Sequence, residues 1–200
     1  SGAFAIGATG TSSSLAGIPF YRADDSIYTH DVSGTDSTAQ YNTAYGVNAL
    51  DAITTSDYNV AIGYEAGSSL TTHNSDVLIG YQAGKALSTG DDGVIAIGYQ
   101  AGLSLTTCSS SVFIGKNAGD GHDTEDHNMG IGRNALTGSV AGGEYNIAIG
   151  SYVLDDLTSA DGNTVVGYAA GAALTTGNYN VAIGYAAMNT GITTGAGNVC

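Results

Sequence analysis

Basic residues are scarce in this sequence. Lysine and arginine together number 4 among 200 residues, against 18 aspartates and glutamates, and the formal net charge is −14. A surface that binds nucleic acid neutralises phosphate groups with clustered lysine and arginine. The composition therefore excludes nucleic acid as a partner.

Proline, cysteine and long apolar segments are scarce as well. One proline accompanies 31 glycines, which do not recur at every third position, so a collagen helix is excluded. Two cysteines are too few for the disulfide framework of a small secreted domain. No apolar run approaches the roughly 18 residues that a membrane-spanning helix needs, so no membrane insertion is predicted.

A short repeat fills most of the chain instead. Segment 59–64, Asn-Val-Ala-Ile-Gly-Tyr, returns unchanged at 180–185, and variants lie between the two. Its fourth residue defines a series of anchors that recur every 17 or 18 residues: Tyr28, Tyr45, Ile62, Ile79, Ile97, Ile114, Ile131, Ile149, Val166 and Ile183. This period is too short for a helical pair or a propeller blade. We predict an all-β, parallel β-solenoid (β-roll) of about ten coils, with two short strands per coil, over residues 28–200. Residues 1–27 are predicted to be an atypical coil, a cap or a docking arm.

Alternation along each strand predicts the faces of the coil. Val60, Ile62 and Tyr64 are bulky, and we expect them inside. The small residues that alternate with them predict a flat outer face, exposed to solvent or packed on a sister chain: Ala61, Gly63, Ala96, Gly98, Ala182 and Gly184. Apolar residues eight positions after the anchor predict the second wall of the core: Ile53, Leu70, Leu87, Leu105, Leu157 and Leu174. Asparagines three positions before the anchor predict a structural ladder.

The repeated Asn-Val-Ala-Ile-Gly motif, followed by polar turns rich in glycine, resembles the head repeats of trimeric autotransporter adhesins. It is also similar to the repeat shafts of some phage tail fibres. The resemblance covers roughly residues 40–200. It implies a trimer of left-handed parallel β-rolls with an extracellular adhesive or fibre role.

The sixth coil departs from the repeat and is the one candidate metal site. Several carboxylate and imidazole side chains lie close together in one segment of this coil. Because most of the candidate ligand atoms are oxygens, Ca²⁺ is favoured over Zn²⁺. The candidate ligands are Asp120, His122, Asp123, Asp126 and His127. The alternative is a solvated acidic turn that needs no cofactor.

Lys116 and Arg133 stand in neighbouring coils where the repeat has tyrosine. Two like charges one coil apart repel each other unless acids or tyrosine rings accept them. We expect them to pair with Asp120 or Glu125. A salt-bridged contact with another subunit is the alternative.

Threonine pairs, beginning with Thr54 and Thr55, recur beside the second wall. They predict a structural ladder of hydroxyl groups, and a regular threonine array is also typical of ice-binding solenoids. No set of nucleophile, base and orienting group is visible among the four histidines, so the sequence predicts no enzyme.

The two ends of the repeat suggest a route of assembly. The strand at Asn198, Val199 and Cys200 begins another coil, and an anchor-like strand near the start has the same periodicity. Unpaired strand edges invite partners. A head-to-tail contact is therefore predicted between these three residues and Phe4, Ala5, Ile6 and Gly7.

The function predicted from the sequence is that of a structural subunit or shaft of an extracellular fibre, at a cell surface, in a secreted fibre or on a virion. Self-assembly gives a filament or a homotrimer, head-to-tail or laterally. The alternatives are a receptor- or glycan-binding adhesin or tail-fibre module, and an ice-binding solenoid.

Overall fold

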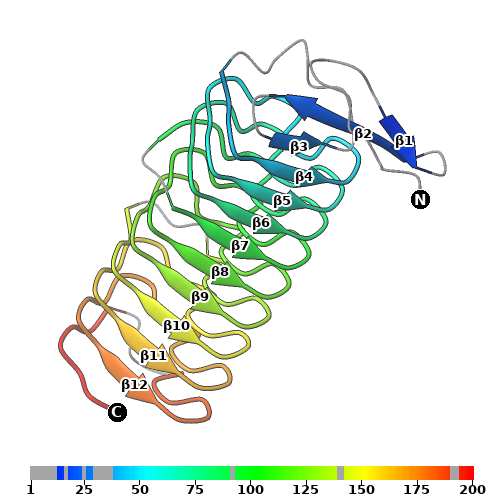
Figure 1. Cartoon of the computed structure of the whole chain (residues 1–200). Helices are drawn as coiled ribbons and strands as arrows, with labels where there is room; N and C mark the ends of the chain where they lie inside the picture. The colour runs from blue at the N-terminus through cyan, green and yellow to red at the C-terminus, as the bar shows by residue number, and fades with distance from the viewer. Residues whose placement is uncertain are drawn as a thin grey trace.

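The chain forms a rod of stacked coils (Figure 1). The computed structural model describes residues 13–15, 18–23, 26–28, 38–90, 93–138, 142–189 and 194–200. All regular elements in these residues are β-strands: β1 (Ser13–Leu15), β2 (Ile18–Ala23), β3 (Ser26–Tyr28), β4 (Thr43–Tyr45), β5 (Val60–Ile62), β6 (Val77–Ile79), β7 (Ile95–Ile97), β8 (Val112–Ile114), β9 (Met129–Ile131), β10 (Ile147–Ile149), β11 (Thr164–Val166) and β12 (Val181–Ile183). Phe4, Ala5, Ile6 and Gly7 lie outside the described residues.

One sheet contains all of the strands in sequence order. From β3 to β12 each strand pairs in parallel with the next, and the first residue of each strand lies beside the first residue of its neighbour from β4 onward. At the N-terminal end, β2 is antiparallel to β3 and β1 is antiparallel to β2. The parallel β-solenoid predicted from the 17–18-residue period is confirmed.

Each described coil contains one strand, whereas the sequence predicted two. The opposite side of the coil, which includes the Leu-Thr-Thr segments, is irregular but still hydrogen-bonded between coils. The Thr54 N–H donates to the Thr71 carbonyl at 3.1 Å, and the Thr71 N–H donates to the Ser88 carbonyl at 3.0 Å.

The predicted facing of the strands is wrong. In each strand from β4 to β12 the middle residue is buried and the outer two face away from the core: Ala61 is 0% exposed, whereas Ile62 is 39% exposed. The middle row therefore belongs to the core and not to a flat outer face, which corrects the assignment of Ala61, Ala96 and Ala182. The second wall is confirmed, because all six of its predicted residues are fully buried.

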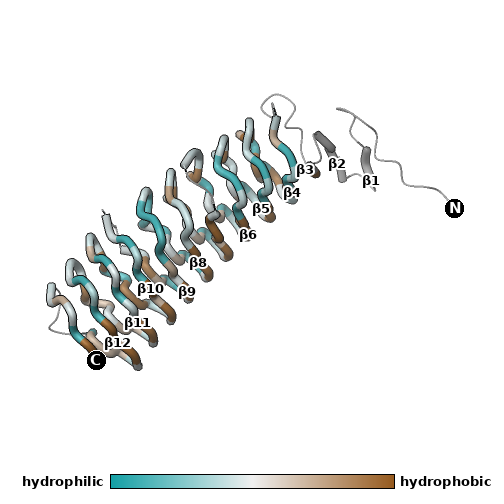
Figure 2. The backbone as a smooth tube through the Cα atoms, turned by 60° about the vertical axis from the view of Figure 1, so that its left-hand side comes forward, coloured by the Kyte–Doolittle hydropathy of each residue, from teal (hydrophilic) through white to brown (hydrophobic). Residues whose placement is uncertain are grey.

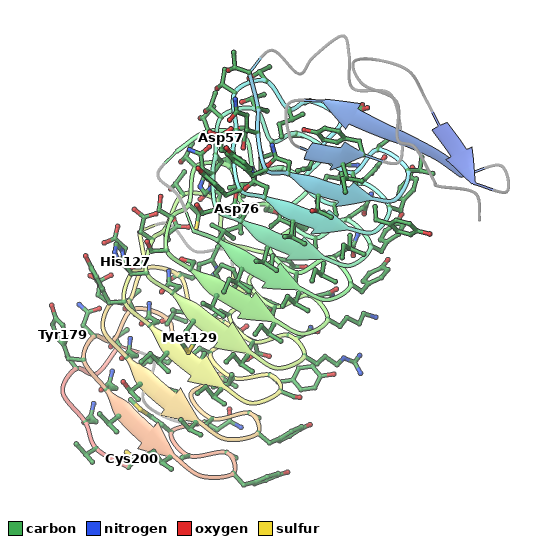
Figure 3. All side chains as sticks on the ribbon, in the orientation of Figure 1. Asp57, Asp76, His127, Met129, Tyr179 and Cys200 are labelled. Atoms are coloured by element: carbon green, nitrogen blue, oxygen red, sulfur yellow. The ribbon has the colours of Figure 1, made fainter. Side chains whose placement is uncertain are left out.

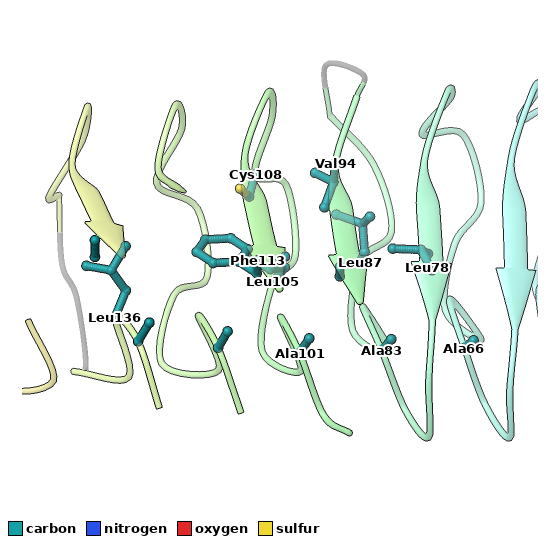
Figure 4. Packing of buried hydrophobic residues seen from close by; sticks show 14 of the residues in the cluster. Ala66, Leu78, Ala83, Leu87, Val94, Ala101, Leu105, Cys108, Phe113 and Leu136 are labelled. Carbon is teal, nitrogen blue, oxygen red and sulfur yellow. The ribbon is translucent and has the colours of Figure 1, made fainter. Parts of the chain in front are cut away.

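The coil interior is narrow, and this explains why small residues lie inside. Where the middle residue of a strand is large, the residue six positions later in the same coil is glycine. Where the middle residue is small, the later position can hold leucine. Phe113 precedes Gly119, where an added Cβ would lie 2.2 Å from the phenylalanine ring. In the next coil, Gly130 leaves room for Leu136. Figure 4 shows Phe113, Leu105 and Leu136 inside the stack.

Tyr28 was predicted to be the first anchor of the repeat, but the structure shifts it by one position relative to the other anchors. Ile27 pairs with Thr43, so Tyr28 lies beside Ala44 in the buried middle row, where it is 0% exposed. The sheet changes from parallel to antiparallel pairing at β3. The 17–18-residue spacing of the parallel coils therefore does not predict which residue of β3 is buried.

The asparagine ladder is confirmed. Asn146 donates its backbone N–H to Asn128 Oδ1 at 2.9 Å, and its own Oδ1 accepts from the Asn163 N–H at 3.1 Å. Its side-chain nitrogen donates to the Ala160 carbonyl at 2.8 Å. These amides satisfy buried backbone groups at a turn where the strand ladder does not reach.

Candidate functional site

The outer surface of the parallel sheet carries mostly apolar side chains over nine consecutive strands, β4 to β12. We call it the sheet face and define it as the first and third residues of β4 to β12. It contains Thr43, Tyr45, Val60, Ile62, Val77, Ile79, Ile95, Ile97, Val112, Ile114, Met129, Ile131, Ile147, Ile149, Thr164, Val166, Val181 and Ile183. None of these residues is charged, although the chain has a net charge of −14.

This face is open to solvent in the single chain. Its side chains are half-buried or exposed, and Ile183 reaches 64% exposure. Figure 2 shows the hydrophobic colour repeating from coil to coil along the strand side of the rod, with hydrophilic loops on the side away from it. A continuous apolar surface rimmed by polar groups is typical of an interaction site.

Two rims border the sheet face. The leading rim comprises the residues two and three positions before each strand, and the trailing rim the residue two positions after it. Because the strand runs from one rim to the other, the rims lie at opposite edges of the face. Figure 3 labels Asp57, His127 and Tyr179 on the leading rim and Met129 on the face between the rims.

Tyrosine rings stack along both rims from coil to coil. On the trailing rim, Tyr64, Tyr81 and Tyr99 stack with ring centroids 5.3 and 5.1 Å apart. On the leading rim, the rings of Tyr41 and Tyr58 lie 5.0 Å apart. Because these rings cover one another's faces, the rows present ring edges and hydroxyl groups to the outside.

Lys116 and Arg133 interrupt the tyrosine row on the trailing rim. The structure does not pair them with Asp120 or Glu125, as the sequence predicted. Lys116 Nζ lies 5.3 Å from the centroid of the Tyr99 ring, and Arg133 Cζ lies 5.5 Å from the centroid of the Tyr152 ring. The Glu125 carboxylate instead accepts backbone N–H groups, including that of Gly142 at 2.9 Å. Both cations are exposed.

One surface ion pair lies beside the same rim. Lys85 Nζ is 2.5 Å from Glu65 Oε2, and Gln82 donates to the same oxygen at 2.8 Å. The bonds from Lys85 and then from Gln82 lower the pKa of Glu65 to about 2. Both side chains are partly exposed at the surface, and a surface ion pair of this kind contributes little to stability.

The residues of the candidate metal site do not converge. His122 points into the core and is fully buried, whereas His127 is exposed and stacks on Tyr145 with centroids 4.9 Å apart. Asp126 Oδ1 accepts the Ser109 N–H at 2.6 Å, and Asp123 Oδ1 accepts the Thr124 N–H. Within the described ranges, no three histidine, cysteine, aspartate or glutamate side chains are grouped to hold an ion. Partial burial raises the pKa of Asp120.

His122 occupies the second-wall row that holds leucine in most other coils. Its ring lies 5.3 Å from that of Phe113, and neither ring nitrogen makes a hydrogen bond of ordinary geometry. Burial lowers the pKa of His122 to about 4; the backbone of Leu136 acts in the opposite direction but is outweighed. The ring is therefore neutral at pH 7.

A second buried histidine was not predicted from the sequence. His73 Nδ1 lies 2.7 Å from Asp76 Oδ2, and both side chains are 0% exposed. His73 Nε2 lies 2.9 Å from the Cys108 carbonyl, which can only accept, so this nitrogen donates. The sequence signal that could have revealed this pair is Asp76, which stands at a position where most other coils have asparagine.

This pair resembles part of a catalytic triad only in composition. Its hydrogen bond reaches the Cys108 carbonyl and not the thiol. Burial raises the pKa of the Cys108 thiol to about 12, which keeps it protonated and unreactive. Asp76 Oδ1 accepts the Val94 N–H at 2.8 Å, so the pair maintains the ladder between coils.

The threonine row likewise bonds within the stack. Thr54 Oγ1 donates to the Thr71 carbonyl at 2.9 Å, and Thr71 Oγ1 donates to the Ser88 carbonyl at 2.9 Å. The predicted hydroxyl ladder is confirmed, and the hydroxyl protons of these residues are used inside the protein.

The C-terminal residues continue the solenoid as predicted. Val199 forms a parallel bridge with Val181, and Asn198 donates to Asn180 Oδ1. Cys200 is exposed, and neither it nor Cys108 forms a disulfide. No described helix is long and apolar enough to cross a membrane.

Comparison with models of protein families, with curated proteins and with solved structures gave no match.

Proposed function

We propose that this chain is a structural subunit that self-associates laterally, with the sheet face covered by another copy. The observation that supports this proposal is the uncharged sheet face. Nine strands about 4.8 Å apart make it roughly 40 Å long. Six residues separate the rims, which gives a width of about 20 Å at about 3.3 Å per residue.

The resulting area, roughly 800 Å², is what each partner contributes to a stable protein interface. A second copy suits the surface because its strands repeat at the same spacing, so side chains can interdigitate along the full length. An unrelated globular partner would match this spacing over only a few coils. The role that fits is a rod or shaft in a fibre, which we place outside the cell because of the acidic surface and the resemblance to adhesin heads.

Head-to-tail growth stays a prediction beside the lateral contact. The described residues after β12 keep the pairing of the stack, since Val199 forms a parallel bridge with Val181. Ice binding has no comparable support, because the hydroxyl groups that it would use donate to backbone carbonyls.

Ile97→Lys tests the lateral contact. Ile97 lies mid-way along the sheet face, where a buried lysine would leave a charge without a partner. We expect the wild type to sediment as an oligomer and Ile97→Lys to sediment as a monomer of about 20 kDa, with its circular dichroism spectrum unchanged. Ser104→Lys adds the same charge at an exposed residue beside the opposite wall and is expected to stay oligomeric. A monomeric wild type at high concentration, or association of Ile97→Lys equal to that of the wild type, would contradict the proposal.

A further inference from the structure

The two rims have opposite charges. The described trailing rim contains Lys116 and Arg133 and no acid, whereas the described leading rim contains Asp57, Asp126, Glu144 and Asp161 and no lysine or arginine. The cations follow β8 and β9, and three of the acids precede β9, β10 and β11. Both groups therefore lie in the same part of the rod.

The cations are available for a partner. They rest on tyrosine rings, they are exposed, and no acid lies within ion-pair distance of either among the described residues. Asp126 uses Oδ1 for the Ser109 N–H, and that bond leaves Oδ2 unused. Two adjacent cations repel each other in the single chain, and a carboxylate placed between them would remove this repulsion.

Symmetry determines which rims meet when two sheet faces pack. A rotation axis parallel to the rod leaves each residue at the same position along the rod in both copies. It also places the trailing rim of one copy against the leading rim of the next. A two-fold axis parallel to the strands makes the two rods antiparallel. In that arrangement each rim of one copy lies against the same rim of the other copy. Both arrangements bury the sheet face, and therefore the rim charges decide between them.

We infer that copies of this chain associate in parallel and without stagger, with Lys116 and Arg133 of one copy bound to the leading rim of its neighbour around Asp126. This inference rests on the proposed function. Arg133 and Asp126 flank the same strand, β9, so a rotation axis along the rod brings them to equal height. Lys116 lies one coil away, about 4.8 Å along the rod. Closed symmetry about that axis repeats the contact at every interface.

Cross-linking between single-cysteine variants tests the arrangement. Arg133→Cys and His127→Cys place thiols on opposite rims at exposed residues of the β9 coil, in a Cys200→Ser background that removes the exposed native thiol. Cys108 is buried. The two variants are mixed, dissociated, reassociated and treated with a bismaleimide about 10 Å long, matching the usual distance between packed sheets.

The inference predicts a covalent dimer in the mixture that links residue 133 to residue 127, and little product from Arg133→Cys alone. Strong 133–133 cross-linking, or oligomers without the 133–127 product, would overturn it and leave the lateral contact standing. A wild type that stays monomeric would overturn the proposed function as well.

Charge reversal gives an independent readout. Lys116→Glu/Arg133→Glu is expected to raise the dissociation constant of the oligomer by roughly tenfold at low salt, with less effect at high salt, because exposed charges are screened. Lys85→Gln is the control, since Lys85 already pairs with Glu65 in its own chain. An unchanged dissociation constant in the double variant would overturn the role of the two cations.

Discussion

Gly98→Ala is expected to destabilise the rod by at least about 3 kcal/mol, the combined cost of a strained backbone and a steric clash. Gly98 follows β7 and has φ +141°, a conformation that residues with a Cβ rarely adopt. A Cβ at this position would lie 2.4 Å from the carbonyl oxygen of Gly115 in the next coil. The obstacle is backbone, so it cannot rotate away as a side chain would.

Gly93→Ala separates the two causes. Gly93 also has a positive φ, +92°, but nothing lies within 4 Å of the position its Cβ would take. We expect this control to lose about 1 kcal/mol, which is the cost of the dihedral angle alone. Chemical denaturation of both variants measures the difference. Equal losses would show that the close approach of the coils at Gly98 contributes nothing.

The second large effect concerns His122 and pH. Its folded pKa is about 4, below the ordinary value of 6.5, so the folded state disfavours the charged ring. The stability that comes from a neutral His122 is therefore fully present above pH 6.5 and decreases as the pH falls towards 4. At 1.36 kcal/mol per pKa unit, the loss is roughly 3 kcal/mol.

His122→Leu should remove this acid sensitivity. Leucine fills the same row at Leu105 and Leu87, and it has no charged form to desolvate. Urea unfolding at pH 7 and pH 4.5 is expected to show a smaller loss in the variant than in the wild type. His127→Gln, at an exposed position, should keep the wild-type loss. Glu65 does not obscure the comparison, because its lowered pKa affects stability between about pH 4.5 and 2. An identical loss in His122→Leu would mean that another group causes the acid sensitivity.

The period alone was enough to predict the stacked coils, the second wall and the ladders of asparagine and threonine. These features depend on which residues share a row, and counting along the chain determines that. The prediction of a second strand in each described coil was wrong. The Leu-Thr-Thr side bonds between coils, but its geometry does not form a continuous ladder.

The facing of the strands could not be predicted from bulk and polarity. Val60 and Ile62 look like core residues because they are β-branched and apolar, yet they lie on the sheet face. Ala61 lies inside because the opposite wall already fills the narrow coil. The available signal was the middle row, where Leu78 and Phe113 replace alanine and a glycine follows each six positions later.

The same misreading supports the proposed lateral contact. A row that looks like core in the sequence and lies outside in the single chain fits a surface that a second chain covers. The metal-site hypothesis had no comparable structural support, because proximity in sequence does not bring side chains together when a coil directs His122 inward and His127 outward.

Oxidation of the two methionines tests the covered sheet face most directly. Met129 lies on the face in β9, and Met188 is a core residue that is 7% exposed. Peroxide converts an accessible methionine to its sulfoxide, and mass spectrometry of proteolytic peptides gives the rate at each site. We expect Met129 to react as slowly as Met188 in the wild-type oligomer and roughly tenfold faster in monomeric Ile97→Lys, with Met188 slow in both. Equal Met129 rates in the wild type and in Ile97→Lys would contradict a sheet face covered by a second copy.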